Sequence, residues 1–437
     1  MNKFTLHDLQ MRQFRRQVLR GFVRRWFLWS LILLLCTPLA VQFFAQERSL
    51  VAGENRVLAS RPDWPMSWTE MSRFGNRYDD FLKDHFGLRA TLVAGNAQLH
   101  YRLFSEAPST QMSVGKAGYL FFNSHSAGAP FRMIDFLCGS DVKPEVIAEL
   151  ATRLNDILQM TQRGATPSLI AFAPSKPVLY GEFMPDWLQT RCQQSQPSLP
   201  LILKALHTQS ERAFFVYPLA QMQNAKAQQQ LYPKENFHWH GRGAQVFADT
   251  IAQQYWHLSA QQELHFKSES AVSDMQNFMP GIPLQIEVEM PDLAQAKIQE
   301  CRGGHCLPAL AHAALLGDIS HFVQSAPDPK AAPKPRKLLI ISDSFGQGAA
   351  AYFAPYFSEV WHVSSNNMGA LNEAQLSQVR ASFEAYHPDQ LLYLFHDFSV
   401  TCFSNSLNYC PLNLTQLLPK IHPYPNISLA KNSTQNK

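Results

Sequence analysis

A serine placed between a strand and a helix is the first candidate for chemistry in this sequence. Residues 338–342 are mostly apolar, as in a buried strand, and Asp343 and Ser344 follow them just before a helix-forming run. A serine at such a turn projects its Oγ at the carboxyl end of the sheet, where open α/β sheets bind ligands. Ser344 is therefore a candidate nucleophile, and the N–H groups of Phe345 and Gly346 are candidate oxyanion donors. The alternative is an ordinary helix N-cap.

Two histidines crowd together ahead of another predicted helix, at 241–255. His238 and His240 lie in the polar and aromatic segment 231–244. An imidazole takes and returns a proton near neutral pH, so His238 is the candidate general base for Ser344. The two histidines would point to opposite faces of an extended segment and make a poor metal pair, so we expect neither a metal nor a cofactor. A purely structural histidine is the alternative.

The elements that must position these residues alternate between strands and helices. Short apolar strands separated by helices of about 10–16 residues predict a parallel sheet with helices on both faces, an α/β fold. Residues 258–337 interrupt the alternation and end in a Pro-rich surface loop. The predicted strands are 168–173, 213–219, 338–342, 360–364 and 390–395, and the predicted helices 144–162, 241–255, 346–357 and 371–386.

Four further polar residues follow predicted strands at the same edge of the sheet. Asn366 and Asn367 are candidate oxyanion donors, with ordinary turn asparagines as the alternative. Asp397 ends the last strand and is a candidate to line the site. Lys176 is expected to fix the loop after its own strand, with a substrate contact as the second interpretation.

A basic segment and an apolar run form the N-terminus. Residues 1–25 carry a net charge of +6, and residues 26–45 contain no charged side chain. Such a run spans about 30 Å as a helix, one bilayer core, and the basic flank places its own side in the cytoplasm. We predict an uncleaved signal anchor with the rest of the chain exported; a cleaved signal peptide and a buried helix are the alternatives. The exported part has a net charge of −2, which argues against a nucleic-acid partner.

The exported part contains an even number of cysteines, which is typical of disulfides in an oxidising compartment. Cys301 and Cys306 flank a short flexible loop that a disulfide would close, and Cys402 and Cys410 would do the same. A zinc site that uses Cys301, His305 and Cys306 is the alternative. The candidate disulfide cysteines are Cys138, Cys192, Cys301, Cys306, Cys402 and Cys410.

These patterns divide the chain into successive regions. The tail from about residue 420 is expected to be disordered because it is rich in Pro, Asn and Ser. The predicted regions are a cytoplasmic basic tail (1–25), a transmembrane anchor (26–45), a linker and helical segment (46–110), an α/β domain (111–400) with an insertion (258–337), and a C-terminal tail (401–437).

Together, the histidine and serine segments resemble the AlgX/AlgJ-type polysaccharide O-acetyltransferases, an SGNH-hydrolase-like family. That family carries an Asp-x-His-Trp motif followed by a Gly-Ala helix start, and later a Gly-Asp-Ser-Phe motif. Residues 236–239 and 243–244 are similar to the first, and residues 342–345 to the second. The resemblance runs from about residue 60 to 400 and thins across 258–337. Further similar segments are 80–89, 118–121 and 173–180.

The resemblance implies a fold, an activity and a location. The fold would be SGNH-hydrolase-like, and the anchor makes the chain more similar to the AlgJ type. Ser344 would carry the acetyl group and His238 would be its base. The donor side would be a multi-pass membrane acyltransferase, and the acceptor an exported polysaccharide, as in alginate biosynthesis. The protein would sit in the bacterial inner membrane with its catalytic domain in the periplasm. A carbohydrate esterase is the rival enzyme.

The sequence departs from the family pattern at the third catalytic position. The family has an aspartate two residues before the histidine, where this chain has Asn236. Asn236 would still orient His238, or another acid would substitute, with Glu235 and Asp397 as candidates. The third interpretation is a catalytically impaired binding or assembly subunit. At Ser342, where the family has glycine, an added Cβ is expected to crowd the oxyanion pocket.

Overall fold

The computed structural model describes residues 23–38, 40–41, 58–124, 132–140, 142–161, 166–206, 212–325, 336–404 and 414–423. Most of the predicted basic tail, the Pro-rich loop at 326–335, and the chain beyond 423 lie outside these residues. The chain divides into two compact units. The first comprises residues 1–108 with 276–283, and the second comprises 109–275 with 284–437.

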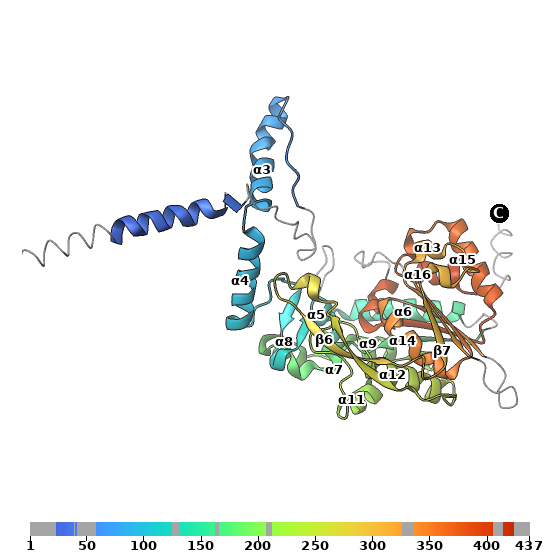
Figure 1. Ribbon diagram of the computed structural model, residues 1–437. Coiled ribbons are helices and arrows are strands. Elements are labelled where there is room, and N and C mark those ends of the chain that lie inside the picture. Colours follow the sequence, from blue (N-terminus) through green and yellow to red (C-terminus); the bar gives the residue numbers. More distant parts are fainter. Residues whose placement is uncertain are drawn as a thin grey trace, which may run out of the picture. The chain divides into compact units, whose positions relative to one another are not determined.

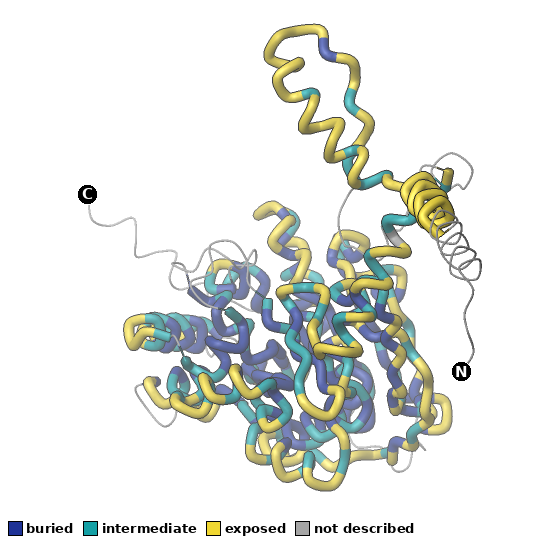
Figure 2. The backbone as a smooth tube through the Cα atoms, turned by 90° about the vertical axis from the view of Figure 1, so that its left-hand side faces the viewer, coloured by how far each residue is buried: buried dark blue, intermediate teal, exposed yellow. Residues whose placement is uncertain are grey.

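The first unit is helical. Residues 23–38 form a helix that exposes large apolar side chains, among them Trp26 and Trp29. Helices α3 (Trp68–Asp84) and α4 (Arg89–Phe104) follow, and no residue of α3 is buried, as the yellow tube shows (Figure 2). Within the described parts of the chain, no helix combines the length and the apolar character needed to cross a membrane.

The second unit is built on a seven-stranded mixed sheet with the order β4-β3-β11-β9-β10-β8-β7. The five strands from β4 to β10 are parallel, whereas β8 and β7 are antiparallel additions at one edge. The prediction of a parallel sheet therefore holds for five strands only. The strands are β3 (Ser168–Ala173), β4 (Phe215–Val216), β7 (Ile298–Arg302), β8 (Ile319–Gln324), β9 (Lys337–Ser342), β10 (Glu359–Ser364) and β11 (Gln390–His396).

The antiparallel edge comes from the segment at 258–337 that breaks the sequence alternation. Antiparallel strands need no long helical crossover between them, so this segment lacks the strand–helix rhythm that marks the parallel part. It also contains β5 (Phe266–Val272), which pairs antiparallel with β6 (Gln285–Pro291) in a separate ribbon. A second ribbon joins β1 (Met112–Val114) to β2 (Leu120–Phe122).

Alternate side chains of the central strands enter two cores. Leu338 and Ile340 of β9 pack on the face covered by α12 and α14, while Leu339 and Ile341 pack on the face covered by α6, α15 and α16 (Figure 1). This is the period-two pattern of a strand buried on both faces. These helices are α6 (Pro144–Thr161), α12 (Arg242–Thr250), α14 (Ser344–Phe353), α15 (Glu373–Tyr386) and α16 (Leu414–Ile421).

The last helix belongs to the core, although the sequence predicts a tail from residue 401. Leu414, Leu417, Leu418 and Ile421 of α16 are all buried, so the α/β body extends beyond residue 400. The shorter helices are α5 (Met133–Cys138), α7 (Lys176–Leu179), α8 (Asp186–Gln193), α9 (Ser198–Lys204), α11 (Leu219–Lys226) and α13 (Ala313–Leu316).

Two disulfides are seen among the described residues. Cys138 pairs with Cys192, and Cys301 pairs with Cys306 as predicted from their spacing. The second pair excludes the alternative zinc site in this state, because both sulfur atoms are bonded to each other. Cys402 is also disulfide-bonded, and its predicted partner Cys410 lies outside the described residues.

Candidate active site

The turn from β9 into α14 holds Ser344 at the carboxyl end of the sheet. Asp343 caps the helix: one carboxylate oxygen accepts the N–H of Phe345 at 2.9 Å. The other accepts the N–H of His396, the last residue of β11, and the hydroxyl of Ser399, three residues later, both at 2.8 Å. Burial raises the pKa of Asp343, and these donors offset part of the rise. The two oxygens of the Asp343 carboxylate therefore join the start of α14 to the end of β11.

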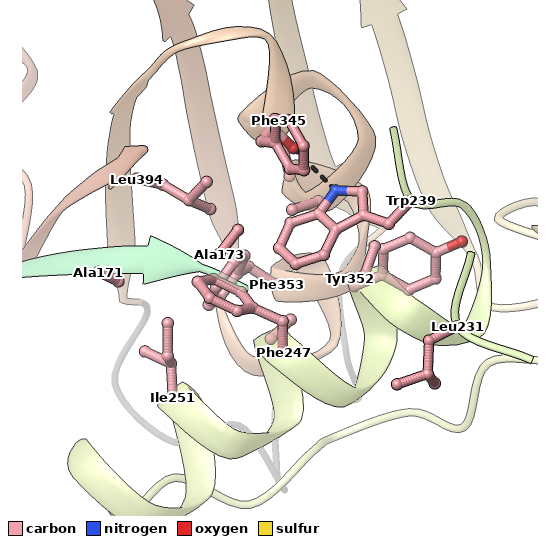
Figure 3. Close-up of a cluster of buried hydrophobic side chains, with 14 of the residues drawn as sticks. Ala171, Ala173, Leu231, Trp239, Phe247, Ile251, Phe345, Tyr352, Phe353 and Leu394 are labelled. Atoms are coloured by element: carbon pink, nitrogen blue, oxygen red, sulfur yellow. Dashed lines mark hydrogen bonds between the residues drawn. The ribbon is translucent and has the colours of Figure 1, made fainter. Parts of the chain in front are cut away.

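His238 reaches Ser344 from a segment without regular structure. Its Nε2 lies 2.8 Å from Ser344 Oγ. Two contacts of Phe345 hold this approach: its carbonyl accepts the indole N–H of Trp239 at 3.1 Å (Figure 3), and its ring lies 4.8 Å from the His238 ring. The structure thus brings together the two predicted residues, at the hydrogen-bond distance that a nucleophile and its base require.

Asp274 completes a relay that the sequence motifs do not contain. Its Oδ2 lies 2.6 Å from Nδ1 of His238, and its carboxylate also accepts the N–H groups of Phe237 and His238 at 2.7 and 2.9 Å. Burial alone would raise the pKa of Asp274, but the hydrogen bonds from the His238 ring and from these N–H groups outweigh it and lower the pKa. The carboxylate stays charged, as an acid that orients and stabilises an imidazolium must.

Asn236 positions this acid and does not contact the His238 ring. Its Oδ1 accepts the N–H of Asp274 at 2.9 Å, and its Nδ2 donates to the backbone carbonyl of His238 at 3.0 Å. The side chain is fully buried. The interpretation that Asn236 itself orients the imidazole is therefore wrong, because its amide contacts backbone groups and not the ring. The amide holds the backbones of the acid and the base in register.

The other acids considered as substitutes lie elsewhere. Asp397 is fully buried and accepts the N–H and hydroxyl of Ser175 at 3.0 and 3.1 Å and the hydroxyl of Tyr217 at 3.0 Å. Burial raises the pKa of Asp397 to about 6. For Glu235, the contact described is its backbone carbonyl, which accepts the hydroxyl of Ser273. Asp274, and neither of these, faces the imidazole.

Lys176 supports the histidine segment from below. Its Nζ donates to the carbonyls of Lys234 at 2.8 Å and Asn236 at 2.5 Å, and burial lowers its pKa to about 7. The side chain is 1% exposed, so a direct substrate contact is excluded. Lys176 therefore fixes the segment that carries His238, whereas the sequence predicted that it would fix the loop after its own strand.

The predicted oxyanion donors of the helix start are already occupied. Phe345 N–H binds the Asp343 carboxylate, and Gly346 N–H donates to the Asp343 carbonyl at 3.2 Å. The N–H of Ser344 stands at the first helical position, where no intrahelical acceptor exists. It is therefore the remaining candidate oxyanion donor of this turn.

The two asparagines after β10 do not join the site. Asn366 and Asn367 are exposed, and neither is among the residues that line the cavity at Ser344. The Asn367 side chain instead lies against Gly317. They are turn asparagines, as the alternative interpretation has it.

Ser342 fills the space behind the turn. It is fully buried, donates to the Asp343 carbonyl at 2.7 Å and lies 2.8 Å from Nε2 of His362. Burial lowers the pKa of His362 to about 3, so the ring is neutral, and its Nδ1 lies 3.0 Å from the Ser320 hydroxyl. A Cβ on Gly346 would collide with Ser342. The Ser342 side chain therefore packs closely against Gly346 and does not crowd the cavity, contrary to the expectation.

A cavity of about 270 Å³ opens beside the three relay residues. His240 also lines it, so the two histidines share one cavity, contrary to the expectation of opposite faces. Burial lowers the pKa of His240, which keeps this ring neutral near neutral pH. The lining residues are His238, Trp239, His240, Gly241, Asp274, Met290, Pro291, Leu293, Glu300, Arg302, Ser344, Gln347, Gly348, Ala351 and Tyr352.

Four ionisable lining residues were missed by the sequence motifs. Asp274, Glu300 and Arg302 lie in the segment that breaks the strand–helix alternation, where no local pattern marks them. Tyr352, on α14 after Ser344, is easily interpreted as core. Its spacing of eight residues from Ser344, about two helical turns, was the one available signal.

No family model and no curated protein matches this chain. Solved structures that resemble it include a DHHW family protein from Eubacterium siraeum (12% identity, 72% of this chain and 96% of that one, TM-score 0.43). The O-acetyltransferase domain of Pseudomonas putida AlgJ is similar over 66% of this chain and 91% of its own (14%, 0.40). Pseudomonas aeruginosa AlgX is similar over 65% and 61% (12%, 0.33). Both proteins whose motifs the sequence resembles are thus among these structures.

Proposed function

We propose that this chain is an O-acetyltransferase that passes an acetyl group through Ser344 to a hydroxyl group of an exported polysaccharide. The observation that carries the proposal is the continuous relay from Ser344 Oγ to His238 Nε2 and from His238 Nδ1 to the Asp274 carboxylate. A serine, an imidazole and a carboxylate in this order form the arrangement that acyl transfer requires. Asp274 supplies the acid whose absence at position 236 would otherwise argue for an impaired subunit.

The first step acylates the serine. His238 Nε2 takes the proton of Ser344 as Oγ attacks the acetyl carbonyl of the donor, and the imidazolium is stabilised by Asp274. The oxyanion of the tetrahedral intermediate is met by the N–H of Ser344 and by the positive end of α14. When the intermediate collapses, the bond to the leaving group breaks and His238 returns its proton to that group.

The second step transfers the acetyl group. A sugar hydroxyl loses its proton to His238 while its oxygen attacks the acetyl carbonyl on Ser344. Collapse of the second intermediate breaks the bond to Oγ, and the serine recovers its proton from the imidazolium. Water in place of the sugar would give an esterase, so binding of the acceptor decides which reaction prevails.

The proposed location and partners of this reaction are based on the N-terminal sequence and on the sequence resemblance. Residues 26–45 would anchor the chain in the bacterial inner membrane, with the α/β unit in the periplasm. The exposed apolar side chains of the helix at 23–38 support the proposal that this segment lies in a lipid bilayer. A multi-pass membrane acyltransferase would supply the acetyl donor.

The test is to trap the acetyl-enzyme with an activated acetyl ester and to locate the label by mass spectrometry. The wild type is expected to carry one acetyl group on Ser344, Ser344→Ala none, and His238→Gln at least about 10⁴ times less per unit time. His321→Gln is the matched control, because His321 pairs with Glu359 outside the cavity at 3.0 Å. Labelling that is indifferent to His238 would contradict the assignment of the base.

Sugar acceptors then separate the two enzyme classes. A transferase is expected to form acetylated sugar at the expense of free acetate when an oligosaccharide is added. Release of acetate at one constant rate, with or without sugar, would identify an esterase with the same relay.

A further inference from the structure

The wall of the cavity formed by β7 has no role in the relay. Glu300 and Arg302 are two residues apart on this strand, so their side chains project from the same face of the sheet, and both line the cavity. That face is the one covered by α14, the helix that carries Ser344 and Tyr352. We propose that Glu300 and Arg302 bind the acceptor, and that the acceptor is an uncharged sugar unit. The inference rests on the proposed function.

The ion pair on this wall has the donors and acceptors that a sugar needs. Arg302 Nη2 lies 2.6 Å from Glu300 Oε1, and both side chains remain partly accessible. A guanidinium offers several N–H donors in one plane, and a carboxylate offers acceptors beside them. Neighbouring hydroxyl groups of a sugar both donate and accept, so they can bridge such a pair without either charge being neutralised.

Tyr352 lines the cavity with a buried side chain. It is 2% exposed, and its hydroxyl oxygen is also buried. Burial raises the pKa of Tyr352, and the nearby N–H of Gly241 offsets part of the rise, so the phenol stays protonated. The protonated phenol therefore adds no charge to the cavity.

The charges around the cavity select against an acidic sugar. Its lining contains two carboxylates, Asp274 and Glu300, and one guanidinium, Arg302, while burial keeps His240 neutral. With His238 in its neutral, base-competent form, the lining has one excess negative charge. A carboxylate on the sugar would meet repulsion in a partly desolvated place, whereas an uncharged unit would not.

The disulfide behind the wall keeps the ion pair in place. β7 is the edge strand of the sheet, and its last pairing joins Arg302 to Ser320. Cys301 lies between Glu300 and Arg302, so it faces the opposite side, where its bond to Cys306 closes the loop that follows. The edge strand is thereby held at the residue that separates the two cavity side chains.

The first experiment measures equilibrium binding, so that it does not depend on catalysis. The full chain with Ser344→Ala is titrated calorimetrically with a neutral β-1,4-linked glucose or mannose oligosaccharide and with a uronic-acid oligosaccharide of equal length. Neutral sugar is expected to bind at least tenfold more tightly than the uronate. Arg302→Gln is expected to weaken neutral binding about tenfold. Tighter uronate binding, or unchanged affinity in Arg302→Gln, would overturn the proposal.

The matched control is Glu269→Gln, which breaks a similar exposed pair with Lys267 (2.8 Å) on β5 outside the cavity. It is expected to leave both affinities unchanged. Glu300→Gln removes the excess negative charge and is expected to move the preference toward the uronate by about tenfold. A Glu300→Gln protein with the wild-type preference would contradict the charge argument.

A second experiment separates failure of the subsite from failure of the proposed function. In protein with Ser344 intact, the acetyl-enzyme partitions between water and sugar, and the ratio of acetylated sugar to acetate is measured. Arg302→Gln is expected to lower this ratio about tenfold with neutral sugar. Absence of any acetyl-enzyme, even in the wild type, would reject the proposed acyl transfer, whereas an unaltered ratio in Arg302→Gln would reject the subsite alone.

Discussion

The two halves of the proposed relay are built in different ways. The serine half is a strand, an aspartate cap and a helix in direct succession, and Asp343 ties it to the end of β11. The base half comes from two irregular segments, 231–240 and the turn after β5, which meet through Asn236 and Asp274. Lys176 supports that meeting from beneath. One half is local and pre-formed by its own sequence, and the other exists only when distant segments have assembled.

The difference shows how tightly the fold fixes the place of each relay residue. The end of β9 and the start of α14 fix the position of Ser344. The acid needs only to reach Nδ1 of the imidazole, and any segment that passes there can provide it. Asp274 does so, and Asn236 holds Asp274 in place through the two backbone groups that its amide bridges.

Replacement of Asp274 by Asn tests this division most severely. The carboxylate that accepts from His238 Nδ1 would become an amide, which favours the wrong tautomer and leaves the imidazolium without its counter-charge. We expect the acylation rate of Ser344 to fall about 10⁴-fold, as in the serine-protease example from which this magnitude is taken. The measurement is the initial rate of acetyl-enzyme formation.

Asp397→Asn is the comparison variant for this acid, because it changes a buried carboxylate that does not contact the imidazole. Its acylation rate is expected to stay within threefold of the wild type once the folded fraction is measured. An Asp397→Asn defect as large as that of Asp274→Asn would mean that the acid has been assigned to the wrong residue.

The local half could be predicted from the sequence, whereas the assembled half could be predicted only in part. The strand at 337–342, the cap and the helix after it are sequential, and the pattern finds Ser344. His238 is found because its motif is contiguous. Asp274 escapes because its relation to His238 is purely spatial, 36 residues along the chain and across an irregular turn. No periodicity encodes such a contact.

The same reason explains the wrong assignments around the site. Phe345 and Gly346 stand at the right place for oxyanion donors, but Asp343 occupies both N–H groups. Lys176 and Asp397 follow strands at the correct edge, yet their side chains turn inward to satisfy buried carbonyl, N–H and hydroxyl groups. The position of a residue after a strand places it at the carboxyl edge of the sheet. Its hydrogen bonds determine whether the side chain points into the cavity or into the interior.

Replacement of Asn236 by Ala is expected to have the second largest effect. It leaves the N–H of Asp274 and the carbonyl of His238 without their bridging amide, so acid and base lose their fixed spacing. We expect acylation to slow by about 10–100-fold, because misplacement by about 1 Å costs on this scale. The rate of acetyl-enzyme formation is the measurement.

A double variant distinguishes an amide that bridges backbone groups from a position that can hold the acid. Asn236→Asp introduced into Asp274→Asn puts a carboxylate at the position of the family aspartate. The side chain at 236 faces backbone groups and not the ring, so no recovery of activity is expected. Recovery of more than about tenfold would show that position 236 can still serve the imidazole directly.

Replacement of Lys176 by Met is expected to change the pH dependence of the free energy of unfolding more than it changes the acylation rate. Burial lowers the pKa of Lys176 to about 7 in the folded chain, against its usual value near 10.4 when unfolded. Between these values the unfolded chain binds more protons, so the free energy of unfolding of the wild type rises with pH above about 7. Lys176→Met should lose that rise, as followed by urea unfolding from pH 6 to 9, and should slow acylation by about tenfold or less.

Lys234→Met provides the control for this pH profile, because Lys234 is exposed and contributes its carbonyl rather than its ammonium to Lys176. Its unfolding free energy is expected to rise with pH as in the wild type. Equal pH profiles for the wild type and Lys176→Met would show that the buried ammonium does not titrate in this range.

The smallest expected effect probes the packing behind the serine turn. Gly346→Ala brings a Cβ against Ser342, so we expect a loss of about 1–3 kcal/mol in the free energy of unfolding. Ser342→Gly creates the missing space but leaves Nε2 of His362 without its partner, at a similar cost. In the double variant the added methyl group enters the vacated space. The double variant should therefore lose about 1 kcal/mol less free energy of unfolding than the two single variants lose together. Strict additivity in denaturant unfolding would mean that the turn yields elsewhere, and that the local half is less rigid than its hydrogen bonds imply.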